Sequence, residues 1–112
     1  MKKYIELKEN AKATHICVEM RYNLGGFNCF TYTQEKRGYY LHVTPVKRES
    51  RNGYTMESFT AFSGYKQLLK EVTRKSAKAE AAAEAAAADI VGIMVERVCM
   101  KNGLELAQEV TV

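Results

Sequence analysis

Aromatic and basic side chains occur together in the first half of the chain, in a pattern that suits binding to single-stranded nucleic acid. Such binding uses flat rings that stack on bases and cations that follow the phosphates. Arg21, Tyr40 and His42 are expected on one face of a sheet, with Tyr40 as the stacking ring. Five cations in the adjoining loops would hold phosphates: Lys36, Arg37, Lys47, Arg48 and Arg51.

The same residues also have a simpler interpretation. Tyrosine is favoured in strands, and lysines at the rim of a sheet prevent its edges from pairing. A second basic feature is the ridge formed by Lys66, Lys70, Arg74 and Lys78. This ridge could bind phosphates or an acidic protein, or it could be an ordinary solvated helix face.

Four residues could form a zinc site, namely His15, Cys17, Cys29 and His42. They would share a face only if the turn at residues 23–26 made a three-residue hairpin loop. Structural zinc sites use closely spaced ligand pairs, and no Cys-x-x-Cys pair is present. The sequence therefore predicts no metal site and no cofactor.

Catalytic patterns are weak. Ser63 and Lys66 have Ser-x-x-Lys spacing, but the other motifs of the penicillin-binding enzymes are missing, so Ser63 is better interpreted as a helix cap. Glu80 and Glu84 lie on consecutive turns of an alanine-rich helix, where they improve solubility. The prediction is a protein that is not an enzyme.

These side chains must be positioned by strands, because the dominant period from residue 13 to 61 is two. The first strand, 13–22, places Ile16, Val18, Met20 and Tyr22 on one face. Three more strands are expected at 27–33, 39–44 and 54–61, with Pro45 marking a strand end or an edge. A three-residue turn after the first strand would pair it with 27–33, setting Phe30 beside Met20. A turn of two or four residues would place the threonines of 27–33 inside instead.

Helical spacing begins after this region. A helix is expected over 63–75 with Ser63 as its N-cap, and another over 76–101 that ends at Gly103. A bend near Ser76 is favoured over one straight helix. Residues 2–7 and 104–112 could add edge strands.

The predicted fold class is α+β: a twisted antiparallel sheet of about four strands, followed by one or two C-terminal helices packed on one face. A length of 112 residues suits a single domain with a sheet (13–61), a helical part (63–102) and a tail (104–112). Net charge is +4 over residues 1–63, +4 over 64–78 and −4 over 79–112. A polyanion would therefore meet the first two-thirds of the chain.

The compartment is predicted to be cytoplasmic. No secretory signal pattern opens the chain, and no apolar run is long enough to span a membrane. An odd number of cysteines, three, suits reduced thiols better than disulfides.

The order of elements resembles the whirly ββββα fold of Pur-type single-stranded nucleic-acid-binding domains and, more distantly, the transcriptional positive-coactivator fold. The resemblance covers residues 27–75. It rests on Lys36-Arg37-Gly38-Tyr39-Tyr40-Leu41-His42-Val43, Lys47-Arg48, Asn52-Gly53 and Leu68-Leu69-Lys70-Glu71-Val72. The resemblance implies binding of single strands on the open sheet face, and dimerisation. The alanine-rich helix departs from the family pattern.

Two function classes follow. The first is a non-enzymatic protein that binds single-stranded DNA or RNA through the open sheet face, with no membrane partner and with a possible homodimer. Ile93, an apolar residue off the main apolar stripe of the helix, and the small alanine side chains are compatible with such a dimer. The second class is a protein-interaction module acting on an acidic protein partner. It is suggested by a resemblance of 37–41 through 61–64 to small proteins of bacterial mobile elements.

Overall fold

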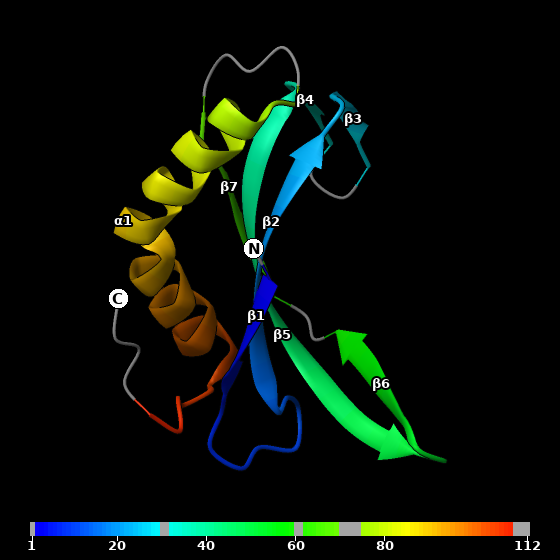
Figure 1. Ribbon diagram of the computed structural model, residues 1–112. Coiled ribbons are helices and arrows are strands. Elements are labelled where there is room, and N and C mark those ends of the chain that lie inside the picture. The colour runs from blue at the N-terminus through cyan, green and yellow to red at the C-terminus, as the bar shows by residue number, and fades with distance from the viewer. Residues whose placement is uncertain (1, 30–31, 60–61, 70–74, 109–112) are drawn as a thin grey trace.

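The computed structural model describes residues 2–29, 32–59, 62–69 and 75–108, and confirms the α+β class (Figure 1). An antiparallel sheet is covered on one side by a single long helix. In chain order the elements are β1 (Lys2–Glu6), β2 (His15–Asn23), β3 (Gly26–Asn28), β4 (Thr33–Glu35), β5 (Gly38–Arg51), β6 (Tyr54–Phe59), β7 (Gly64–Gln67) and α1 (Ala77–Asn102). This helix is not apolar enough along its length to cross a membrane, among the residues described.

The long strand β5 is the axis of the sheet. The strand order is β1-β2-β5-β6, and β7 pairs with β5 on the same edge as β6. Apolar residues of β2 lie opposite apolar residues of β5, as in the pairs Val18↔Val43 and Met20↔Leu41. This matching fixes the register, because a slip of one residue would turn the whole apolar set toward the other face.

The expected pairing of the first strand with residues 27–33 is wrong. Gly26–Asn28 and Thr33–Glu35 form a separate two-stranded hairpin, and Phe30 lies outside the described residues. β2 instead pairs with β5 along its full length. The physical reason is that β5 offers a longer apolar row than the short segment after Gly25 and Gly26, whose positive φ angles turn the chain away.

Pro45 does not end its strand, which continues to Arg51, but it does lie at a local edge. The carbonyl of Val46 accepts a hydrogen bond from the Thr14 amide on the β2 side. Backbone groups of neighbouring strand residues point to opposite sides, so Pro45 points toward β6 and β7. β7 pairing stops at Val43 and β6 pairing starts at Val46, so the missing N–H of proline falls in a gap between two partners.

The predicted helix over 63–75 is wrong at its start, because Gly64–Gln67 is a strand. Ser63 therefore does not cap a helix there, and residues 70–74 lie outside the described part of the chain. Helix α1 agrees with the second predicted helix. Its N-cap is Ser76, whose side chain accepts from the Ala79 amide, and its C-cap is Gly103 with φ 67°.

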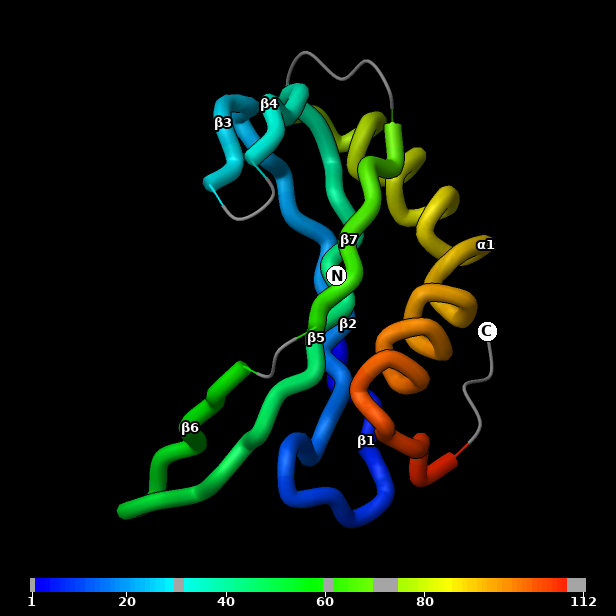
Figure 2. The backbone as a smooth tube through the Cα atoms, turned by 180° about the vertical axis from the view of Figure 1, so that it is seen from behind, coloured from blue at the N-terminus to red at the C-terminus, as the bar shows by residue number. Residues whose placement is uncertain are grey.

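The core lies between α1 and the β2–β5 face. Val95 and Val98 of α1 are fully buried, as are Val18, Leu41 and Val43 of the sheet. The chain after α1 returns to this core: Leu104 is buried, and Leu106 forms an antiparallel bridge with Leu7. Residues 2–6 are confirmed as an edge strand, and α1 covers one face of the sheet only (Figures 1 and 2).

Candidate nucleic-acid interface

The candidate interface is the face of the sheet opposite α1, called here the open face. Strand registers place Arg21 opposite Tyr40, Glu19 opposite His42, and His42 opposite Tyr65. Directly opposite residues point to the same side of a sheet, so all of these side chains share the open face. The β3–β4 hairpin lies at one end of this face and the β5–β6 hairpin at the other (Figure 2).

Tyr40 does not lie as expected, because its ring is buried. It retains 4% of its possible exposure, and its hydroxyl donates to the backbone carbonyl of Lys36 at 2.8 Å. The Tyr65 ring lies beside it, with centroids 6.2 Å apart. Tyr40 therefore packs as part of the fold, and its ring is not available to stack on a base.

Tyr65 is the exposed ring of this face, and the sequence analysis missed it. Its ring stacks on His42 with centroids 5.9 Å apart and planes inclined by 24°, and it remains 38% exposed. The sequence assigned this residue to the first turn of a helix, where it would have packed inward. The only signal for a strand was Gly64, a residue disfavoured within a helix.

His42 is a half-buried imidazole beneath Tyr65. Its Nε2 atom is buried and has no hydrogen-bond partner among the described residues. Burial lowers the pKa of His42, and the positive charge of Arg21 lowers it further. The neutral ring is therefore the form that the fold accommodates.

This burial gives stability a pH dependence. The unfolded chain binds a proton at His42 below about pH 6.5, whereas the folded chain resists it. Protonation of His42 is therefore expected to leave the free energy of unfolding unchanged above about pH 6.5. Below that pH it should lower the free energy of unfolding as the pH drops toward 5. Urea unfolding at several pH values measures it. His42→Gln should flatten the dependence, and an unchanged dependence in this variant would contradict the assignment.

An aromatic ring and a cation also lie in contact where β1 meets the β5–β6 hairpin. The guanidinium of Arg48 sits 4.0 Å from the centroid of the Tyr4 ring. The Tyr4 hydroxyl donates to Glu57 at 2.5 Å, and Glu57 also lies 3.4 Å from Arg48. Tyr4 was not a sequence candidate, because nothing in residues 2–6 indicated which strand they would join.

The other predicted cations are not gathered on this face. Lys47 and Arg51 lie 3.3 Å and 3.0 Å from the same carboxylate, Glu49, and these alternate positions of β5 point away from His42 and Arg48. Lys36 and Arg37 are exposed after β4, and Arg37 donates to the Leu24 carbonyl. Arg21 lies on the open face and pairs with Glu19 at 2.9 Å.

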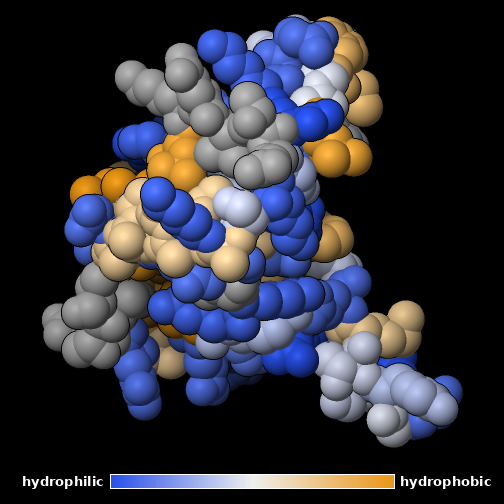
Figure 3. All heavy atoms as spheres, turned by 45° about the horizontal axis from the view of Figure 1, so that its top comes forward, coloured by the Kyte–Doolittle hydropathy of each residue, from blue (hydrophilic) through white to orange (hydrophobic). Residues whose placement is uncertain are grey.

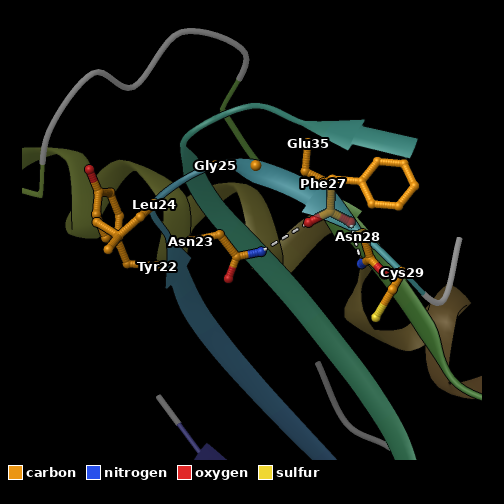
Figure 4. A pocket seen from close by; sticks show the side chains of 9 residues that line it. Tyr22, Asn23, Leu24, Gly25, Phe27, Asn28, Cys29 and Glu35 are labelled. Atoms are coloured by element: carbon orange, nitrogen blue, oxygen red, sulfur yellow. Dashed lines mark hydrogen bonds between the residues drawn. The ribbon is translucent and has the colours of Figure 1, made fainter. Parts of the chain in front are cut away.

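Cys29 follows β3, beyond the Asn23 end of β2, whereas His15 lies at the opposite end of β2, so the four candidate zinc ligands do not meet. It lines a shallow cavity of about 540 Å³ with Leu24, Phe27 and Asn28 (Figure 4). There Glu35 accepts hydrogen bonds from Asn28 at 2.8 Å and Asn23 at 3.4 Å. Across the described residues, no group of three His, Cys, Asp or Glu side chains is placed to hold a metal ion.

The resemblance to Pur-type domains stays a prediction. Comparison of this chain with family models, with curated proteins and with solved structures returns no match in any of the three.

Proposed function

We propose that the protein is a non-enzymatic binding protein that holds single-stranded nucleic acid on the open face of its sheet. The observation that carries the proposal is the partly exposed ring of Tyr65, supported from below by His42 on a face that no described helix covers. A base can stack on the outer side of such a ring. Tyr40, which the sequence predicts as the stacking ring, holds Tyr65 in place by packing beside it.

The cations near this ring can follow a phosphate backbone. Arg21 lies on β2, two strand spacings or about 10 Å from β7, and its side chain is 51% exposed. Arg48 extends the face toward the β5–β6 hairpin, and Lys36 and Arg37 lie at the other end. Exposed ion pairs such as Arg21–Glu19 contribute at most about 1 kcal/mol, so a phosphate can replace the carboxylate. The resulting affinity falls as salt rises.

The test is binding of a labelled oligothymidine at two salt concentrations. Tyr65→Ala is expected to weaken binding by about 5- to 150-fold, the equivalent of about 1–3 kcal/mol for one stacked base. Met100→Ala is the control, because Met100 is 79% exposed but lies on α1, on the other side of the sheet. Equal binding by the two variants would argue against the open face.

A second candidate function, binding of an acidic protein partner, is favoured by a groove between β7 and α1. This groove has a volume of about 290 Å³ and an apolar floor that includes Met94 and Val98. Its two charged lining residues, Lys66 and Arg97, are both cations. Absence of oligothymidine binding at low salt would leave this class as the better proposal.

A further inference from the structure

Strand β6 is an edge strand that carries an unusual amount of exposed apolar surface. All six of its residues are exposed, and three of them are large apolar side chains: Tyr54 at 76%, Met56 at 55% and Phe59 at 69%. The β5–β6 hairpin projects from the body of the molecule (Figures 1 and 3), and its contact with Tyr4 of β1 is made by Glu57 and Arg48, on the face opposite Tyr54 and Met56. Edges of this kind pair with other strands unless they are blocked.

The direction of the backbone groups shows which residues are open for pairing. Val46 and Arg48 direct backbone groups to Thr14 on the β2 side, so Lys47, Glu49 and Arg51 direct theirs toward β6. Their partners on β6 are Ser58, Met56 and Tyr54. By alternation, Thr55, Glu57 and Phe59 point their backbone N–H and C=O groups outward. The positive φ angles of Asn52 and Gly53 agree with a two-residue hairpin turn of this register.

We infer that β6 pairs antiparallel with β6 of a second copy of this chain, with Met56 opposite Met56 of the partner subunit. In this register the outward groups of Thr55 and Glu57 meet those of the partner and form about four backbone hydrogen bonds. The two methionines occupy the close, non-hydrogen-bonded position, and each Tyr54 lies diagonal to the opposite methionine. Because a two-fold axis relates the two subunits, Met56 and Tyr54 of each subunit are covered by the same two residues of the other.

Neighbouring registers are worse for physical reasons. A shift that centres the axis on Glu57 places two carboxylates directly opposite each other, which is destabilising. A shift that centres it on Thr55 leaves the outward groups of Glu57 facing the Gly53 turn, so backbone bonds are lost. A second copy is the occupant that the strand itself specifies, because the centre of the pairing is apolar and no two like charges lie directly opposite each other.

The oligomeric state tests this inference without any nucleic acid, so its failure is separate from failure of the proposed function. Light scattering after size exclusion should give the wild type twice the 12.7 kDa mass of one chain. Met56→Lys should give a single chain, because two lysines would face each other. Ile93→Lys is the matched control, since Ile93 is 61% exposed on α1, and it should remain a dimer. A monomeric wild type, or loss of the dimer in both variants, overturns the inference.

A cross-link tests the register. In a Cys29→Ser background, which removes the exposed native thiol, Met56→Cys should form a disulfide-linked dimer on mild oxidation. The distance between paired strand positions suits a disulfide. Ser58→Cys should not, because the two Ser58 positions would lie about 14 Å apart along the strands. Cross-linking of Ser58→Cys instead, or of neither variant, would contradict this pairing.

Discussion

Leu41→Ala is expected to lower the free energy of unfolding by about 2–5 kcal/mol, the range for removing a fully buried leucine side chain. Leu41 lies in the part of β5 that pairs with both β2 and β7, is completely buried, and belongs to the cluster between the sheet and α1. Domains of this size have a total stability of about 5–15 kcal/mol. One truncation at this position therefore removes a large fraction of it.

Urea unfolding followed by circular dichroism measures this loss. Leu24→Ala is the matched control, because it deletes the same atoms from a side chain that is 73% exposed. It should change stability by less than about 0.5 kcal/mol. Similar losses in both variants would mean that the β2–β5 face is not the core.

Gly64→Val is expected to destabilise the fold by about 1–3 kcal/mol through overpacking. A Cβ atom at Gly64 would lie 3.2 Å from Cγ2 of Val98 and 3.5 Å from Cε of Met94. Val98 is fully buried, and its methyl group would have to shift by a few tenths of an ångström to accommodate this contact. The added methyl groups would push α1 away from β7.

A double-mutant cycle identifies the contact responsible. Val98→Ala removes the methyl groups that a larger residue at position 64 would meet. Gly64→Val combined with Val98→Ala should lose less stability than the two separate losses together, with a coupling of about 0.5–3 kcal/mol. Simple additivity would show that Gly64 is required for another reason.

The sequence was sufficient to predict the elements whose apolar spacing reflects packing against the single hydrophobic core. Alternation of Ile16 and Val18 predicted β2 and its buried face, and Ser76 and Gly103 predicted the ends of α1. It was not sufficient for pairing between strands, because nearest-neighbour logic placed residues 27–33 beside β2. The actual partner, β5, is reached only after the intervening β3–β4 hairpin.

The site was predicted in position but not in its central residue. Arg21 and His42 do share a face with Tyr40. However, exposure depends on what covers a residue, and the strand that covers Tyr40 comes from a segment with helical spacing. Tyr65 and Leu68 are three residues apart, which a helix and an irregular strand can both produce. Only the tertiary structure shows that the outermost ring is Tyr65.

The change of partner at Pro45 divides β5 into two cooperative units. Residues 40–43 are paired on both sides and carry the core, whereas β6, among the described elements, is paired with β5 only and adds one side-chain hydrogen bond to β1, from Tyr4 to Glu57. Local opening of the β5–β6 hairpin therefore exposes no residue of the hydrophobic cluster, and its amide hydrogens can exchange with solvent without global unfolding. The hairpin can order or loosen in response to a bound partner while the rest of the protein keeps its stability.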